Sequence, residues 1–89
     1  MKLKNLDDIL LAANECVNSM YQLTSDEKNP DFLIESANKV GLKYMDKLCL
    51  KASKLITNTE EDISTFYKIS ELRTVATFIS KGFLGEYEQ

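Results

Sequence analysis

The sequence predicts an all-α protein, a small bundle of helices. Glycine occurs 3 times and proline once in 89 residues, too few for a β-sandwich, a β-barrel or a glycine-rich phosphate loop. Apolar residues recur at helical spacing, and residues that cap helices precede three of the apolar runs. A chain of this length forms one domain, which we place at residues 1–82, with residues 83–89 as a short C-terminal tail.

The first predicted helix spans residues 5–23. Asn5 can cap its N-terminus, and Asp7 and Asp8 suit the positive end of the helix dipole. Leu11 is the one large apolar residue on the polar side. The apolar face contains Leu6, Ile9, Leu10, Ala13, Cys16, Val17, Met20 and Tyr21.

Two helices, at residues 30–40 and 42–57, are predicted to follow. The run Asn29-Pro30-Asp31 is typical of a helix start, with Asn as the cap and Pro at the first position. Across Gly41 the apolar face rotates by about a third of a turn, so one straight helix cannot bury both faces against one core. We therefore predict a break at Gly41. The alternative is three helices, with the middle two continuous and Gly41 packed against a neighbour. The face before Gly41 contains Phe32, Leu33, Ala37 and Val40, and the face after it contains Tyr44, Met45, Leu48, Cys49, Ala52, Leu55 and Ile56.

The last predicted helix spans residues 60–81. Thr57, Asn58 and Thr59 each precede an acidic residue by three positions, the spacing of a capping box, and Gly82 suits the C-terminal end. The first half of this helix is apolar on one side and the second half on nearly the opposite side. Such a helix is central to a bundle or contacts two bodies, so we predict a twofold homodimer. The interface candidates are Phe78, Phe83, Leu84 and Tyr87.

Five lysines form what we call the lysine ridge: Lys39, Lys43, Lys47, Lys51 and Lys54. Residues 39–56 contain these five lysines and one aspartate, a net charge of +4. Like charges four residues apart destabilise a helix, which suggests that something negative lies opposite. The alternative is a solvated face, paired through Glu35 with Lys39 and through Asp46 with Lys43 and Lys47. The candidate partner-binding residues are Lys39, Lys43, Lys47, Leu50, Lys51 and Lys54.

Catalytic, metal and cofactor sites are not predicted. The chain has no histidine, the commonest general base and metal ligand. Cys16 and Cys49 are far apart and lie on apolar faces, as expected for buried, reduced thiols in a cytoplasmic protein. The apolar run near the N-terminus is too short for a signal sequence or a membrane span. We therefore expect a protein that is not an enzyme and does not bind membranes.

A non-enzymatic protein–protein interaction module, such as a small regulator, inhibitor or adaptor, is the leading functional hypothesis. The residue bias fits an AT-rich genome, such as that of a phage or a low-GC bacterium. One alternative is a nucleic-acid-binding accessory protein that uses the Lys39–Lys54 ridge. The net charge of −3 and a single arginine, Arg73, disfavour base-specific recognition. Another alternative is a helical bundle like a bacteriocin immunity protein or a secretion chaperone, a likeness of size and charge only.

Overall fold

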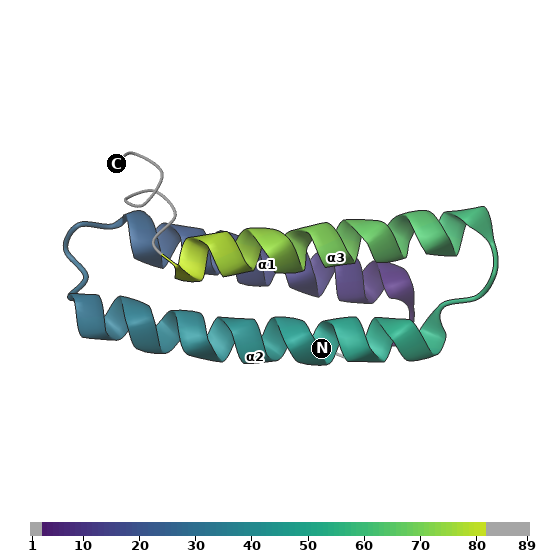
Figure 1. Ribbon diagram of the computed structural model, residues 1–89, viewed down its shortest axis with the longest axis horizontal. Coiled ribbons are helices and arrows are strands. Elements are labelled where there is room, and N and C mark those ends of the chain that lie inside the picture. The colour runs from purple at the N-terminus through teal and green to yellow at the C-terminus, as the bar shows by residue number, and fades with distance from the viewer. Residues whose placement is uncertain (1–2, 82–89) are drawn as a thin grey trace.

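The chain forms a bundle of three helices, as the computed structural model shows for residues 3–81, the part of the chain that it describes. The helices are α1 (Leu6–Ser25), α2 (Asp31–Leu55) and α3 (Glu60–Ser80), and each packs against the other two. They run up, down and up, so α1 and α3 point in the same direction and α2 in the opposite one (Figure 1). No residue between 3 and 81 is in a β-strand. The predicted all-α bundle is confirmed.

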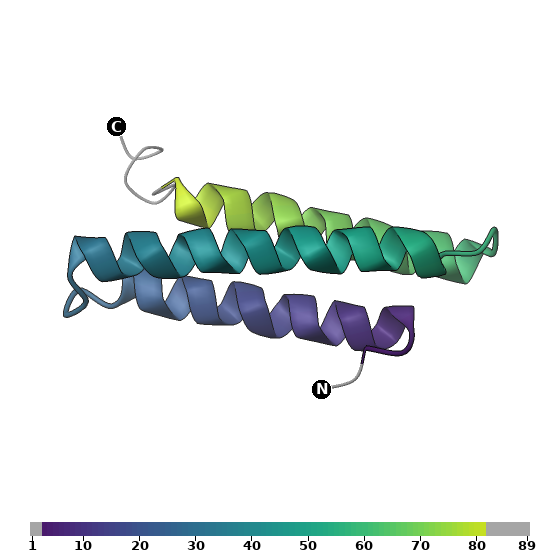
Figure 2. The same cartoon turned by 90° about the horizontal axis from the view of Figure 1, so that it is seen from below.

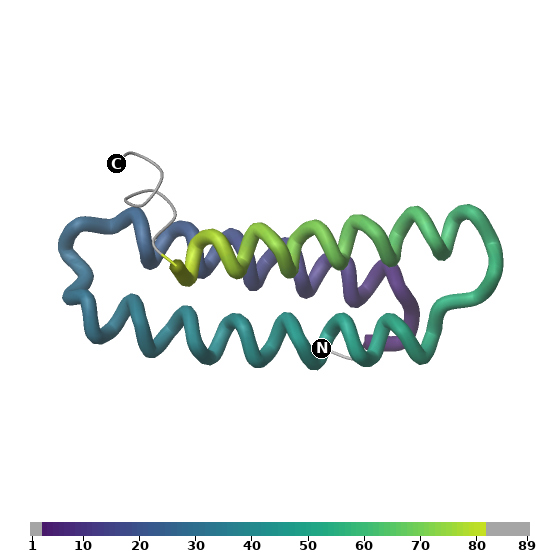
Figure 3. Tube along the Cα trace, in the orientation of Figure 1, coloured from purple at the N-terminus to yellow at the C-terminus, as the bar shows by residue number. Residues whose placement is uncertain are grey.

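Gly41 does not break the chain into two helices. The helix α2 continues through it without interruption, as the trace in Figure 3 and the second view in Figure 2 show. The predicted break between 30–40 and 42–57 was therefore wrong, and the three-helix alternative was right. Gly41 is buried, and a Cβ atom there would lie 2.7 Å from Sδ of Met20 and 2.9 Å from its Cγ. The glycine lets α1 approach α2 closely rather than ending a helix.

The core lies along the common axis of the three helices. Its largest fully buried side chains are Ile9 from α1, Met45 and Leu48 from α2, and Ile69 from α3. Burial of such side chains contributes about 1.5–3 kcal/mol each relative to exposure. The other buried apolar residues are Leu6, Ala12, Ala13, Val17, Met20, Ala52, Ala76 and Ile79.

Within residues 3–81, no helix is both long and apolar enough to cross a membrane.

Two of the helix starts use the caps that the sequence predicts. The N–H of Asp8 donates to Oδ1 of Asn5 at 2.9 Å, which begins α1. The N–H of Asp62 donates to Oγ1 of Thr59 at 3.2 Å, so Thr59 is the cap among the three candidates before α3. Each bond satisfies a backbone donor that has no partner within the helix.

The N-cap of α2 differs from the prediction, in which Asn29 was the cap and Pro30 the first residue of the helix. Pro30, not Asn29, is the N-cap of α2, and its side chain makes no capping hydrogen bond. The side chain of Asn29 instead donates to the carbonyl of Leu23 at 3.0 Å. Nearby, Asn38 is buried and donates through Nδ2 to Oγ1 of Thr24 at 3.2 Å, while its Oδ1 has no partner among the described residues. These side chains fix the end of α1 against the start of α2.

Candidate functional site

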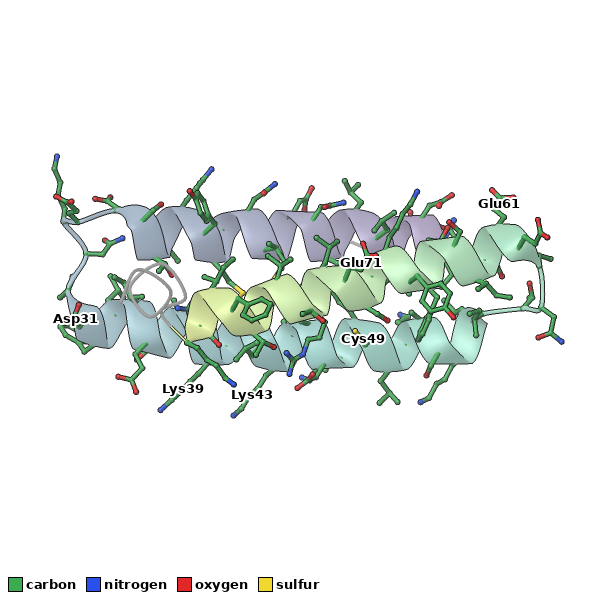
Figure 4. All side chains as sticks on the ribbon, turned by 45° about the horizontal axis from the view of Figure 1, so that its top comes forward. Asp31, Lys39, Lys43, Cys49, Glu61 and Glu71 are labelled. Carbon is green, nitrogen blue, oxygen red and sulfur yellow. The ribbon has the colours of Figure 1, made fainter. Side chains whose placement is uncertain are left out.

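The lysine ridge lies on the exposed side of α2. All five of its lysines are exposed, and Figure 4 shows Lys39 and Lys43 projecting from the same edge of α2, away from the other two helices. Nζ of Lys39 lies 3.7 Å from a carboxylate oxygen of Glu35, which is the predicted pair. The other four lysines form no ion pair with any residue in the range 3–81. Most of the ridge therefore has no negative partner in the described part of its own chain.

Asp46, which interrupts the ridge in sequence, pairs with a residue of another helix. Nε of Arg73 on α3 donates to Oδ1 of Asp46 at 2.6 Å, and Nη1 of the same guanidinium donates to the hydroxyl of Thr77. The predicted pairing of Asp46 with Lys43 and Lys47 is not observed. Because this carboxylate pairs with Arg73, its negative charge does not neutralise the ridge, and the four lysines without ion-pair partners among residues 3–81 keep a positive field.

Large apolar side chains are exposed on the same helix. Phe32 is 73% exposed and Val40 is 69% exposed, although both were assigned to a buried face. Leu50, which falls among the lysines in sequence, is 59% exposed. The rotated apolar stripe before Gly41 was the signal of this surface, because a straight helix cannot bury both stripes. The structure resolves the conflict by leaving much of the first stripe exposed.

An apolar groove runs between α1 and α2, bordering this exposed stripe. Its volume is about 310 Å³. The small side chains of Ala12 and Ala37, together with Gly41, leave the space that the groove occupies. No residue of α3 lines it, so it opens on the side of the bundle that α3 does not cover. The lining residues are Ala12, Glu15, Cys16, Ser19, Met20, Leu23, Ala37, Val40, Gly41 and Tyr44.

Val40 and Tyr44 connect this groove to the lysine ridge. Both line the groove and both are exposed. Val40 precedes Lys43 by three residues and Lys47 by seven, and Tyr44 precedes Lys47 by three, so these side chains share one side of α2. The opposite rim, on α1, carries Glu15. The groove thus has an apolar lining and an acidic residue on its α1 rim, and the lysines of the ridge lie beyond Val40 and Tyr44 on the outer side of α2.

The two cysteines are half-buried and free. The thiol of Cys16 lies in the groove and donates to the carbonyl of Gly41 at a sulfur–oxygen distance of 3.6 Å. Burial raises the pKa of the Cys16 thiol. Burial also raises the pKa of Cys49, with Asp46 acting in the same direction and Arg73 against it. Both thiols are therefore protonated near neutral pH, which makes them poor nucleophiles.

The two predicted sets of binding residues lie on different helices. The ridge and Leu50 belong to α2, whereas Phe78 belongs to α3 and is 40% exposed. Phe83, Leu84 and Tyr87 lie outside the described residues. In the range 3–81 there is no cluster of three or more His, Cys, Asp or Glu side chains that could hold a metal ion.

Comparisons with protein-family models, with curated proteins and with solved structures each found no match to the chain. The fold and the groove define the class only as a three-helix bundle with an apolar groove beside a row of exposed lysines. The function is accordingly inferred from that surface.

Proposed function

We propose that this protein is a non-enzymatic interaction module that binds an acidic amphipathic helix of another protein. The observation that carries the proposal is the apolar groove between α1 and α2, which lies beside the exposed lysine ridge. Four of the five ridge lysines have no ion-pair partner among residues 3–81. Binding of an amphipathic helix in an apolar groove is a recurrent mode of peptide recognition.

The apolar part of the surface explains why the ligand is a helix. The groove lies between two antiparallel helices, and a third helix can lay side chains spaced three and four residues apart into it. Val40 and Tyr44 would contact those anchors from one wall, and Leu23 and Cys16 from the other. Burial of Val40 by such a helix would remove from water a side chain that is 69% exposed in the free protein.

The charges explain why the ligand is acidic on one flank. Lys43, Lys47 and Lys51 repeat every four residues, a rise of about 6 Å along the helix. A partner helix with Glu or Asp at every fourth position would offer carboxylates at the same interval. Glu15 on the α1 rim disfavours acidic residues on the other flank. Complementary charge of this kind raises the association rate and fixes orientation more than it adds affinity.

Nucleic-acid binding is the second candidate function, because four lysines of the ridge lack carboxylate partners within the described part of the chain. The net charge of −3 and the apolar groove beside the ridge favour a protein ligand. The two functions differ in salt dependence. Binding to a polyanion falls steeply with salt because counterions are released, whereas a ligand held by apolar contacts is less sensitive.

A matched pair of helical peptides tests the proposal. Both carry the same leucine anchors, and one has Glu and the other Lys at the positions that flank the α2 rim. Fluorescence anisotropy should show at least about tenfold tighter binding of the acidic peptide, a difference of about 1.4 kcal/mol. A single-stranded oligonucleotide is titrated in parallel at two salt concentrations. Oligonucleotide binding with a steep salt slope, and no binding of either peptide, would support the second function instead.

Two matched variants and two cysteines locate the binding site. Val40→Glu should abolish binding of the acidic peptide, whereas Leu11→Glu should not, because Leu11 is also exposed but does not line the groove. Saturating peptide should slow alkylation of Cys16 and leave that of Cys49 unchanged. Equal binding of both peptides, or binding that survives Val40→Glu, would contradict the proposed site.

A further inference from the structure

We propose that the outward face of α3 is a self-complementary surface that binds α3 of a second copy, antiparallel and about a twofold axis. This contact is separate from the proposed function, because no residue of α3 lines the groove between α1 and α2. A twofold dimer is also expected from the sequence, where three of the four interface candidates, Phe83, Leu84 and Tyr87, lie outside the described residues. The dimer contact proposed now is inferred from the residues of α3 that are exposed in the bundle.

A stripe of residues mostly three or four positions apart, with Ser70 and Glu71 side by side at its centre, runs the length of α3 on its exposed side. Tyr67 is 64% exposed, and Ile63 and Phe78 are 38% and 40% exposed. Spacing by three and four keeps side chains on one side of a helix. The buried residues of α3 lie on its other side and pack in the core of the bundle: Ile69, Ala76 and Ile79. The stripe contains Glu60, Ile63, Tyr67, Ser70, Glu71, Thr74, Phe78 and Lys81.

The order of residues in this stripe is what makes it self-complementary. When two copies of α3 lie antiparallel with the midpoint between Ser70 and Glu71 on the twofold axis, each residue faces one equally far from that midpoint. Glu60 then faces Lys81, an acid against a base. Ile63 faces Phe78, and both are exposed apolar side chains. Tyr67 faces Thr74, and the twofold axis repeats every pair.

Charge selects the antiparallel arrangement over the parallel one. The first turn of α3 carries Glu60, Glu61 and Asp62, which a parallel pair would bring together. Like charges in direct apposition are destabilising, and two parallel helix dipoles add to the repulsion. The antiparallel pair instead places Lys81 beside the acidic first turn of the other copy at both ends. Glu71 approaches its symmetry mate near the axis, so this position weakens the contact.

The size of the contact sets its expected strength. The 21 residues of α3 extend over about 31 Å at about 1.5 Å per residue. Contact along one helix of this length is at the small end of specific interfaces, below about 1,200 Å² in total. We therefore expect an equilibrium between monomer and dimer in the micromolar range.

Sedimentation of the full chain from 5 to 500 μM measures this equilibrium. The wild type should shift from monomer to dimer over this range, and Tyr67→Glu should weaken the dimer at least tenfold. Leu50→Glu is the matched control, since Leu50 is exposed to a similar extent but lies on α2. Circular dichroism verifies that each variant is folded. A wild type that is monomeric throughout, or a dimer lost with Leu50→Glu but kept with Tyr67→Glu, would overturn the proposal.

Charge reversal tests the register without altering apolar residues. Glu60→Lys and Lys81→Glu should each weaken the dimer, and the two together in one chain should restore most of it. Glu71→Gln should strengthen it. Failure of the double reversal to recover any dimerisation would contradict the Glu60–Lys81 pairing.

Cysteine placement tests the orientation of the two helices. On mild oxidation, Glu71→Cys should form a disulfide-linked dimer because residue 71 lies near the axis. Glu60→Cys should not do so beyond the level of the wild type, because the two copies of residue 60 lie at opposite ends. Efficient linkage through residue 60 would show a parallel pair and overturn the antiparallel one.

Discussion

The helices α1 and α2 use their apolar residues differently. The 20 residues of α1 bury six apolar side chains, and most of its predicted apolar face lies in the core. The 25 residues of α2 include five buried residues, but only three of these, Met45, Leu48 and Ala52, have apolar side chains. Six large apolar side chains of α2 remain exposed: Phe32, Leu33, Val40, Tyr44, Leu50 and Leu55. The core of the bundle thus uses most of the apolar surface of α1 but leaves much of the apolar surface of α2 exposed.

The largest expected difference between the two helices is in how far truncation of an apolar side chain lowers the free energy of unfolding. Ile9→Ala on α1 should lower it by about 2–5 kcal/mol, because Ile9 is completely buried and its truncation leaves a cavity. Val40→Ala on α2 should change it by no more than about 0.5 kcal/mol, as expected for an exposed position. Urea denaturation followed by circular dichroism measures both. A loss for Val40→Ala close to that for Ile9→Ala would mean that the exposed stripe of α2 is part of the core.

A smaller effect is expected where the two helices touch most closely. Gly41→Ala should gain up to about 1 kcal/mol in helix propensity but lose about 1–3 kcal/mol by crowding Met20. The expected net result is a loss of about 1 kcal/mol. In a Met20→Ala background the crowding is absent, so Gly41→Ala should stabilise the protein by about 0.5–1 kcal/mol.

A double-mutant cycle over these four proteins gives the coupling directly. Denaturation midpoints, analysed with a common m-value, supply the four free energies. If Gly41→Ala stabilised the wild type as well, Met20 would be free to move aside. The close approach of the two helices would then not explain the glycine.

The smallest effect on stability is expected at the lysine ridge. Replacement of Lys43, Lys47 and Lys51 by Gln removes repulsion between like charges, which is worth a few tenths of a kcal/mol for each pair. Stability should hold or rise slightly, while affinity for the acidic peptide falls. Thermal unfolding and anisotropy test the two expectations separately. A large loss of stability would show that these lysines pair with acidic groups of their own chain.

Local patterns predicted the parts of the fold that depend on neighbours in sequence. The cap by Asn5, the cap by Thr59 and the pair between Glu35 and Lys39 were each readable from spacing, because both partners belong to one helix. The bundle class followed from the scarcity of turn-forming residues. The position of Leu11 on the exposed side of α1 was correct as well.

Contacts between helices were not readable in this way. Asp46 pairs with Arg73, 27 residues away on α3, and no spacing rule connects them. Gly41 looked like a helix end because its contact with Met20 exists only once α1 and α2 are packed together. The groove has the same origin, since its walls come from two helices. The ridge could therefore be predicted from the sequence, and the rotated apolar stripe was a signal of the exposed apolar surface beside it, but the groove could not be predicted.

The placement of the groove on the side that α3 leaves uncovered has a consequence for valency. A second copy bound along the outer face of α3 would leave the groove of each copy open. Such a pair would present two equivalent sites at a fixed separation, so that binding at one site raises the effective concentration of a linked ligand at the other. Bivalent attachment of this kind can strengthen binding by about 10²–10⁴ without any new contact. A partner that carries two acidic helices would then be held far more tightly than either helix alone.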